Sequence, residues 1–531
     1  MSKRMIRRRA LAAAPFIVAL IGKPAVAQQQ DALLLLTRTD TFSIERFRRT
    51  AHQLQSELLI RAAGARMNLS GTLDDRGRVQ TLTSEARAAA ADRASAPAQS
   101  ATLTFVGDSV IAELGSGAAK TTQRFGSRVG AVPFVNPSFS LVELAILEAR
   151  RTDRDTVVVG LFLVQGGKTV DAKVIRLGRD SVVIDFGNVV ARLAVSSNGD
   201  ILGGEIPSQG LRLVRVSALA DEAMAMAKPD YGAPPDAPYT AIDVVIPTKM
   251  GHTLAGTLTL PKSPHGRVPA LVTITGSGSQ DRDEAIPLVK GYRPFRQVAD
   301  TLARHGIAVL RMDDRGFGGS GGNAAMSTSA DFADDIRAGL AFLRSRPEID
   351  GGRLGLIGHS EGGLIAPMIA AGDPVLRGIV LMASPAQTGR QIIEYQQGYA
   401  IDHEAKLSSA QRDSARRQVA TLVDSIANSR PWLRFFSDYD PLPTARRVRV
   451  PVLILQGQTD RQVTMAQATA LAKTMRAGGN KRVTVRVFPE ANHLFVQDPD
   501  GNPAGYATLP NGVVRSDVLS TIVEWVVARM R

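Results

Sequence analysis

Apolar and polar residues alternate with a period of two over much of the chain before residue 220. Short β-branched runs are separated by turns such as Gln165-Gly166-Gly167 and Asn198-Gly199-Asp200. This pattern predicts an antiparallel meander. The expected strands are 156–164, 169–177, 181–186, 191–195, 201–206 and a last one at 211–216. One helix is expected among them, at 138–151.

The earlier part of this region is less regular. Residues 31–84 fit either strands or helices, and the Ala-rich stretch 85–100 has no apolar period, which predicts a loose connection. Gly107-Asp108-Ser109 resembles a fragment of a lipase motif, but it lies between two strand-like runs. We interpret it as a hairpin turn.

A Pro-rich segment divides the chain. Four prolines and a glycine lie within residues 229–238, and Pro favours extended linker geometry. We therefore expect a mainly-β accessory domain at 28–225, a linker at 226–239 and a second domain at 240–531.

After the linker, apolar strands alternate with helices. A hairpin is expected at 241–260, followed by strands at 270–275, 307–312, 354–358, 379–383, 452–456 and 483–488. Helices are expected at 295–304, 330–344, 361–371 and 516–531. Near-continuous apolar strands between helices predict an α/β fold with a mostly parallel sheet covered on both faces. Chemistry in such folds collects at the carboxyl ends of the strands.

Composition excludes several kinds of site. The chain of 531 residues has no Cys, so disulfides, a thiol nucleophile and thiolate metal sites are excluded. The formal net charge is +14, but residues 1–27 hold six basic residues and no acidic one. The remaining excess is scattered among acids, without a basic tract interleaved with aromatics. We therefore expect no nucleic-acid partner.

The N-terminus has the three parts of a secretory signal. Basic residues 3–9 precede a short apolar run at 10–22, and Ala25-Val26-Ala27 offers small residues for cleavage before Gln28. The apolar run is too short to span a bilayer. We expect cleavage after Ala27 and a periplasmic or extracellular protein with no stable membrane span. Arg7-Arg8-Arg9 fits either a general or a twin-arginine export route, and an uncleaved N-terminal anchor is the alternative.

Ser360 is the candidate nucleophile. It lies in Gly358-His359-Ser360-Glu361-Gly362, a G-x-S-x-G pattern between an expected strand and an expected helix. That context is the sharp turn on which such a serine is presented. A second match centres on Ser320, but a flexible Gly-Gly-Asn stretch follows it instead of a helix.

His493 and Asp460 complete a candidate triad. Only His403 and His493 follow Ser360, and His493 is favoured because it comes just after the strand at 483–488. Asp460 follows the strand at 452–456 in the same way. A carboxylate fixes the tautomer of a catalytic histidine, and the chain order Ser, Asp, His is the one expected for an α/β-hydrolase.

The loop after the strand at 270–275 is the candidate oxyanion loop. We expect the backbone N–H groups of Glu361 and Ser277 to form the hole, with Gly278 as the rival to Ser277. The charged residues that follow, at 281–283, are interpreted as ion pairs that fix this loop.

From about residue 240 onward the chain resembles the α/β-hydrolase superfamily. It is most similar to secreted bacterial carboxylesterases of the serine aminopeptidase and dienelactone hydrolase-like branch. The matching stretches are 276–284, 314–320, 358–363, 457–460 and Asn492-His493. Ser279 stands where members of the branch often have Pro. The first 230 residues match no family that we can name.

The resemblance implies a serine esterase that acts on small to medium acyl esters through an acyl-enzyme, without metal or organic cofactor. Residues 387–447 interrupt the alternation of strands and helices, and we expect a helical cap there. Trp432, Phe435 and Phe436 are its candidate substrate-binding residues. A structural excursion away from the site is the alternative.

Two other functions are compatible with parts of the sequence. A serine aminopeptidase acting on short peptides would use the same triad, with Glu361 or Glu394 available for a free amino group. An envelope binding protein with a vestigial hydrolase fold is the non-enzyme alternative, but no triad member is missing. The β domain is expected to stabilise packing or oligomers, with ligand binding as the alternative. The acyl group and the oligomeric state are open.

Overall fold

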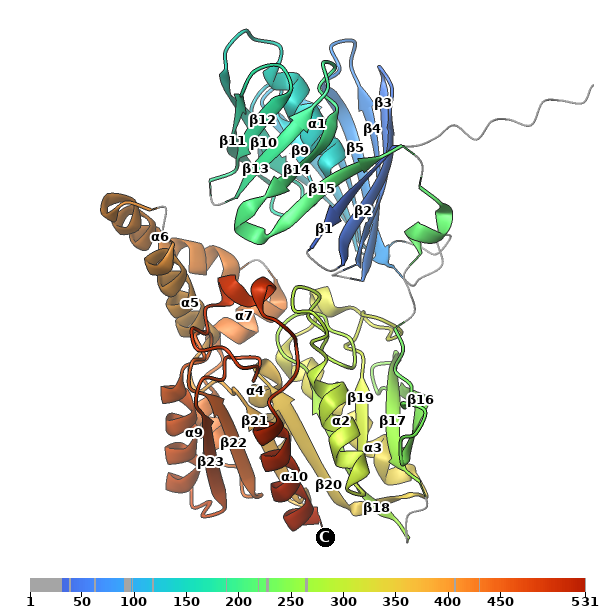
Figure 1. Cartoon of the computed structure of the whole chain (residues 1–531), viewed down its shortest axis with the longest axis vertical. Helices are drawn as coiled ribbons and strands as arrows, with labels where there is room; N and C mark the ends of the chain where they lie inside the picture. The colour runs from blue at the N-terminus through green and yellow to red at the C-terminus, as the bar shows by residue number, and fades with distance from the viewer. Residues whose placement is uncertain are drawn as a thin grey trace, which may run out of the picture.

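The computed structural model describes residues 31–530, apart from 38–39, 62–63, 90–96, 98, 117–118, 188, 218, 226–228, 263–265, 405–406 and 429. The expected signal segment 1–27 therefore lies outside the described residues. Two sheets organise the described part, one in each half of the chain (Figure 1). No helix in this part is long and apolar enough to cross a membrane.

The first sheet has 15 strands, almost all antiparallel. Its order is β8-β7-β6-β5-β4-β3-β2-β1-β15-β14-β13-β12-β11-β10-β9, so two meanders meet where β1 pairs with β15. The first meander consists of β1 (Asp31–Leu36), β2 (Thr41–Arg49), β3 (Gln53–Ile60), β4 (Ala65–Leu73), β5 (Val79–Ala88), β6 (Gln99–Val106), β7 (Ser109–Ser116) and β8 (Ala119–Gly126). The second consists of β9 (Val132–Phe134), β10 (Thr156–Leu163), β11 (Lys168–Arg176), β12 (Ser181–Asp185), β13 (Val190–Val195), β14 (Ile201–Ile206) and β15 (Leu211–Val216).

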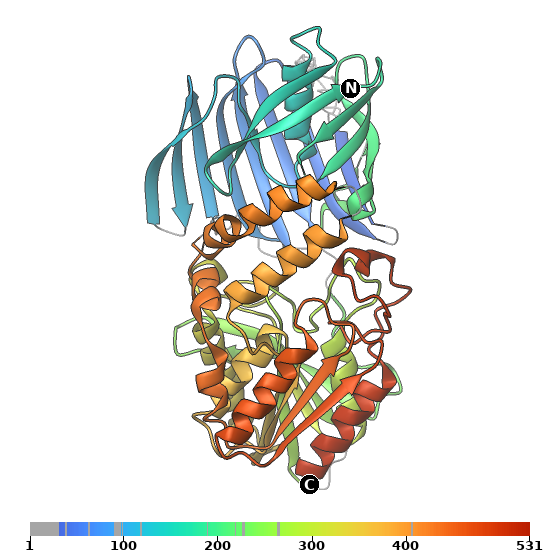
Figure 2. The same ribbon diagram turned by 90° about the vertical axis from the view of Figure 1, so that its left-hand side faces the viewer.

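Helix α1 (Phe139–Ala149) lies inside the curve of this sheet (Figures 1 and 2). Its apolar side chains join one core with strands from both meanders, including Leu58, Ile146 and Phe162. The N-terminus of α1 rests on the buried carboxylate of Glu45. That carboxylate accepts hydrogen bonds from the backbone N–H groups of Phe139 (2.6 Å) and Ser140 (3.0 Å). A negative group is stabilised there by the helix dipole and the unpaired N–H groups.

The strands expected at 156–216 and the single helix are confirmed within a few residues. Region 31–84, which fitted either strands or helices, forms strands in nearly all of its regular elements. The loose connection expected at 85–100 is partly wrong, because β5 runs to Ala88 and pairs with both β4 and β6. Val106 pairs with Ser109, so Gly107-Asp108 is the turn of a hairpin as expected.

The second sheet has eight strands in the order β16-β17-β19-β18-β20-β21-β22-β23. Its strands are β16 (Tyr239–Pro247), β17 (Thr253–Pro261), β18 (Val268–Ile274), β19 (Ala308–Met312), β20 (Ile349–His359), β21 (Gly378–Met382), β22 (Val452–Gly457) and β23 (Val483–Phe488). The first two form an antiparallel hairpin, and the remaining six are parallel to one another. The α/β fold expected from the apolar strands is therefore confirmed.

Helices cover both faces of this sheet. The surrounding helices are α2 (Pro294–Arg304), α3 (Ser329–Ser345), α4 (Glu361–Ala370), α9 (Met465–Ala477) and α10 (Ser516–Met530). Apolar residues of α3, α4 and α9 form the core on one face, and those of α2 and α10 form the core on the other. Burial on both faces explains why the strands read as continuous apolar runs.

Four further helices occupy the stretch between β21 and β22. They are α5 (Gly389–His403), α6 (Ser409–Ala427), α7 (Pro431–Asp438) and α8 (Pro441–Ala445). Figure 2 shows α5 and α6, in orange, rising from the second sheet's domain toward the first. The two halves of the chain also touch at the turn before β4, where a Cβ on Gly64 would lie 3.0 Å from the Phe317 ring.

Candidate active site

Ser360 lies at a strained turn between β20 and α4. Its backbone has φ 52° and ψ −117°, a conformation that non-glycine residues rarely adopt. The flanking glycines make the turn possible. A Cβ on Gly358 would overlap the carbonyl group of Gly362, and a Cβ on Gly362 would overlap that of Ile274. The backbone therefore holds Ser360 at the carboxyl end of a central strand, as the sequence pattern predicts.

His493 and Asp460 are joined by a buried hydrogen bond. The His493 Nδ1 and Asp460 Oδ2 atoms are 2.8 Å apart. The Asp460 carboxylate also accepts bonds from the backbone N–H groups of Gln462 (2.8 Å) and Val463 (2.9 Å). A third donor is Gln456 Nε2, 3.0 Å from Oδ2. The carboxylate is thus fixed in place, and it can hold the histidine in one orientation.

The side chain of His359, the residue before Ser360, is bound to the loop that carries His493. His359 Nε2 lies 2.9 Å from the carbonyl oxygen of His493, and the two imidazole rings are 4.9 Å apart between centroids. Among the described residues, no hydrogen bond joins Ser360 Oγ to His493. Such catalytic bonds are often long in structures without substrate and tighten when it binds.

The same histidine is tied to the candidate oxyanion loop through Glu284. His359 Nδ1 lies 2.7 Å from Glu284 Oε1, and the backbone N–H of Gly276 donates to that same oxygen at 2.9 Å. Burial by itself lowers the pKa of His359, but the Glu284 carboxylate and the His493 carbonyl outweigh it and raise that pKa above the ordinary value. A protonated imidazole can donate from both nitrogens, which matches two oxygen partners.

Asp314 holds the other end of this loop. Its carboxylate accepts bonds from Thr275 Oγ1 (2.7 Å) and from the backbone N–H of Gln280 (2.9 Å), so it pins both sides of the turn that contains Ser277. Burial raises the pKa of Asp314 well above its usual range. In the described part of the chain, the backbone N–H groups of Ser277 and Glu361 have no hydrogen-bond partner. Both are therefore available to an oxyanion.

The ion pairs expected at 281–283 form at Arg282 and Asp283, whereas Asp281 accepts hydrogen bonds from the Tyr231 hydroxyl and from backbone N–H groups. Arg282 makes two bonds of 2.9 Å to the carboxylate of Asp313. Asp283 pairs with Arg311, and it also pairs with Arg293 at 2.6 Å. These pairs brace the loop against neighbouring strands and helices. Within the described ranges, no group of three or more His, Asp or Glu side chains could hold a metal ion.

Comparison with known proteins adds independent evidence. Residues 289–500 match the family described as serine aminopeptidase, S33. The chain is 28% identical over 282 residues to the esterase EstD of Thermotoga maritima, covering 52% of this chain and 65% of that esterase. It is 25% identical over 291 residues to dipeptidyl aminopeptidase BIII of Pseudoxanthomonas mexicana, covering 52% of this chain and 38% of that enzyme.

These matches support the resemblance of the second half of the chain to the α/β-hydrolase superfamily. Among solved structures, an esterase of Pyrococcus furiosus is similar, with 19% identity and a TM-score of 0.40. The alignment covers 56% of this chain and 94% of that one. The chain spans less than two thirds of the length of either curated relative that it matches.

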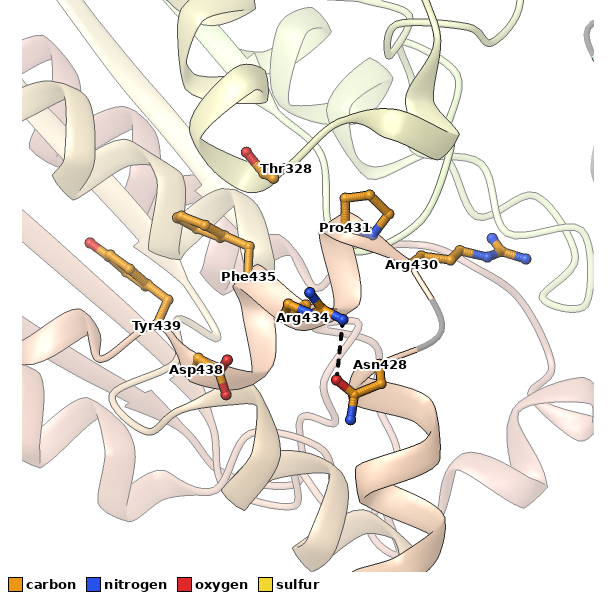
Figure 3. A pocket seen from close by; sticks show the side chains of 8 residues that line it. All are labelled: Thr328, Asn428, Arg430, Pro431, Arg434, Phe435, Asp438 and Tyr439. Carbon is orange, nitrogen blue, oxygen red and sulfur yellow. Dashed lines mark hydrogen bonds between the residues drawn. The ribbon is translucent and has the colours of Figure 1, made fainter. Parts of the chain in front are cut away.

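The three candidate aromatic residues lie in different surroundings. Trp432 reaches helix α4, which follows Ser360, because its Nε1 lies 2.8 Å from Glu361 Oε1. Phe436 stacks on Trp432 and is buried in the core on that face of the sheet. Phe435 lies on another side of α7, where it lines an open pocket of about 690 Å³ together with Tyr439 and Arg434 (Figure 3). The structure therefore does not bring all three to one surface.

Glu361 is a candidate backbone donor, and its side chain makes contacts as well. Its buried Oε1 accepts bonds from Trp432 and from Ser329 Oγ (2.6 Å), and Ser329 begins α3. Burial raises the pKa of Glu361, and these bonds act in the opposite direction. One carboxyl group thus connects α4, α3 and the helices between β21 and β22.

Sequence reasoning missed the roles of His359, Glu284 and Ser329. His359 and Glu284 are 75 residues apart, so no local pattern could pair them. The sequence did offer one indication, because both residues lie in stretches that match the α/β-hydrolase pattern. His359 directly precedes Ser360, and Glu284 ends the loop 276–284. His403, the rejected alternative to His493, is exposed at the end of α5 and stacks on Tyr399.

Proposed function

We propose that the hydrolase cleaves carboxylic esters of small to medium acyl groups, with Ser360 as nucleophile, His493 as base and Asp460 as the group that orients His493. The observation that carries this proposal is the buried hydrogen bond between His493 and Asp460, together with the strained turn of Ser360. The name of the Thermotoga relative, an esterase, supports the same reaction.

The mechanism transfers the acyl group in two halves. Ser360 Oγ attacks the ester carbonyl while His493 Nε2 takes the hydroxyl proton, and Asp460 stabilises the resulting imidazolium. The carbonyl oxygen becomes an oxyanion that accepts bonds from the N–H groups of Glu361 and Ser277. The C–O bond then breaks, and His493 gives its proton to the departing alcohol. Water repeats the sequence on the acyl-enzyme and releases the acid.

We assign the helices between β21 and β22 the role of a cap. Trp432 supports this role, because it contacts the residue directly after the nucleophile. Of the three aromatic candidates, Trp432 is the one retained as a substrate contact. Phe436 acts through Trp432, on which it stacks.

A peptidase is the second candidate. The name of the Pseudoxanthomonas relative favours it. A free amino terminus needs an available carboxylate, however, and Glu361 is already bonded to Ser329 and Trp432. A comparison of the hydrolysis rates of p-nitrophenyl butyrate, an ester, and alanine p-nitroanilide, an amide, separates the two functions. Faster hydrolysis of the anilide would reverse our assignment.

Hydrolysis of p-nitrophenyl butyrate by the chain from Gln28, beside Ser360→Ala, tests the main proposal. We expect activity in the first and a loss on the order of 10⁴- to 10⁶-fold in the second. Equal activity in both proteins would exclude Ser360 as the nucleophile. Inactivity of both, with both folded, would exclude the ester substrate.

We also propose export, based on the N-terminal signal pattern. Expression of the full chain in a Gram-negative host, followed by N-terminal sequencing of the periplasmic fraction, tests it. A mature protein that begins at Gln28 is expected, and retention of residues 1–27 would contradict cleavage after Ala27.

A further inference from the structure

A polar cavity lies between α5 and the loop that carries Asp460. Its volume is about 260 Å³. One wall of the cavity is a face of α5 with Gln396, Tyr399 and His403. The opposite wall consists of Arg461, Gln462 and Asn502. The spacing of the α5 residues, three and four apart, places them on one side of the helix. The cavity therefore lies beneath the helix that we assign to the cap.

Within the described part of the chain, Arg461 lacks the carboxylate partner that many half-buried arginines have. Arg49, for example, pairs with Asp200, and Arg215 pairs with Asp31. Arg461 forms no ion pair with any Asp or Glu of the described residues. Its Nε donates a long bond to the carbonyl oxygen of Asp500, at 3.3 Å. The guanidinium also reaches the phenol of Tyr399, which lines the same cavity, and its five N–H donors exceed these two contacts.

The groups around Arg461 include hydrogen-bond donors, and the carboxylates of Asp498 and Asp500 also act on the phenol of Tyr399. Arg461 opposes the effect of burial on the pKa of Tyr399, so the guanidinium lies close to that phenol. The amide of Asn502 lines the same space. Glu404 is the acidic residue that lines this cavity, and it is exposed just after the end of α5. A planar guanidinium with open donors matches a carboxylate, which it binds through two parallel bonds.

The cavity is coupled to the candidate triad by sequence and by contact. Arg461 directly follows Asp460, and the backbone N–H of Gln462 donates to Asp460 Oδ1 at 2.8 Å. The Gln462 side chain continues to the hydroxyl of Tyr506 at 3.2 Å. A group bound here would therefore lie beside the loop that holds Asp460.

We propose that Arg461, with Tyr399 and Asn502, forms a subsite that binds a free carboxylate on the substrate, so that the preferred ester is an anionic one. This inference rests on the proposed ester hydrolysis. The carboxylate belongs either to the acyl group or to the leaving alcohol, and both sources offer the same chemistry to Arg461.

Selectivity between matched esters tests the subsite. For the acyl side, p-nitrophenyl hemiglutarate is compared with p-nitrophenyl butyrate. For the alcohol side, 4-acetoxybenzoate is compared with 4-acetoxybenzamide. We expect kcat/KM to favour the carboxylate ester by about tenfold or more in one pair, as one charge-assisted contact allows. Arg461→Gln should remove that preference, and Arg461→Lys should keep part of it, because the charge stays while the two-pronged geometry is lost.

Arg434→Gln is the matched control, since Arg434 lines the separate pocket on α7 (Figure 3). It should keep the preference of the parent protein. Absence of a preference in both pairs, or a preference that Arg461→Gln leaves unchanged, would overturn the subsite.

Binding without turnover separates this inference from the proposed function. Monomethyl glutarate and 4-acetoxybenzoate are titrated calorimetrically into the full chain carrying Ser360→Ala, with and without Arg461→Gln. At least one should bind, with a Kd about tenfold or more weaker in the double variant. No binding of either probe, or equal binding in both variants, would overturn the subsite even if neutral esters are hydrolysed. Arginine-dependent binding without any ester turnover would support the subsite and exclude the esterase proposal.

Discussion

At the scale of single residues, the candidate site rests on a few buried polar contacts. Sequence order and strand context were enough to select Ser360, Asp460 and His493, because each follows its own apolar strand and parallel strands end at one edge. The contacts that align these residues were not predictable. The pair of His359 with Glu284 depends on how β20 lies against the loop after β18, which only the folded chain determines.

Asp460→Asn tests the orienting role of the carboxylate. The amide keeps the shape, but its N–H₂ group favours the wrong tautomer of His493, so kcat for p-nitrophenyl butyrate should fall by about 10⁴-fold. Far-UV circular dichroism should stay unchanged. Asp438→Asn, at an exposed position on α7, serves as the control and should retain full kcat. A loss below about tenfold in Asp460→Asn would contradict the role given to Asp460.

His359 should make stability depend on pH. Its pKa is raised in the folded state, so its charged form adds stability that is fully present below the unfolded pKa of about 6.5 and is lost as pH rises through the folded pKa. The difference in Tm between the parent protein and His359→Gln should therefore shrink as the pH rises from about 6 to about 9. His305→Gln, at an exposed histidine, should show no such trend. A difference that is constant with pH would mean that His359 is held neutral.

At the scale of elements, the sequence predicted buried strands well and missed the end of a strand that is held by its neighbours. The strands at 268–274 and 452–457 are buried throughout, and their continuous apolar runs identified them. The strand at 79–88 ends in Glu-Ala-Arg-Ala, where Glu and Ala have low strand preference, and it is held by pairing with β4 and β6 on both sides. Such pairing comes from other parts of the chain and overrides local preference.

The contact of α7 with Glu361 should control acyl-chain preference. Trp432→Ala removes both the ring and the donor to the buried carboxyl group, which enlarges the space beside the nucleophile. We expect the ratio of kcat/KM for p-nitrophenyl octanoate to butyrate to rise several-fold. Phe435→Ala, on the side of α7 that faces the open pocket, should leave this ratio unchanged. An unchanged ratio in Trp432→Ala would count against the cap.

At the scale of the whole molecule, the linker is attached mainly to the second domain. The Tyr231 ring centre lies 4.2 Å from the guanidinium carbon of Arg282, and its hydroxyl lies 3.2 Å from Asp281 Oδ2. The backbone carbonyl of Tyr231 also accepts a long bond from Arg311 at 3.5 Å. A truncation that separates the two halves should therefore keep residues from 229 onward, so that these contacts with the oxyanion loop survive.

The first sheet contacts the second domain at the loop after β19, where the turn containing Gly64 meets Phe317. This contact does not involve Ser360, His493 or the helices of the cap, which favours a stabilising role for the β domain. Deletion of residues 28–228 should lower Tm and expose Phe317, while the ratio of octanoate to butyrate turnover stays that of the parent protein. Scanning calorimetry and chain-length kinetics on the truncated protein measure both. If the truncated protein is soluble and folded but its chain-length ratio changes, the β domain takes part in substrate selection, because the deletion leaves the described contacts of the triad and of Trp432 intact.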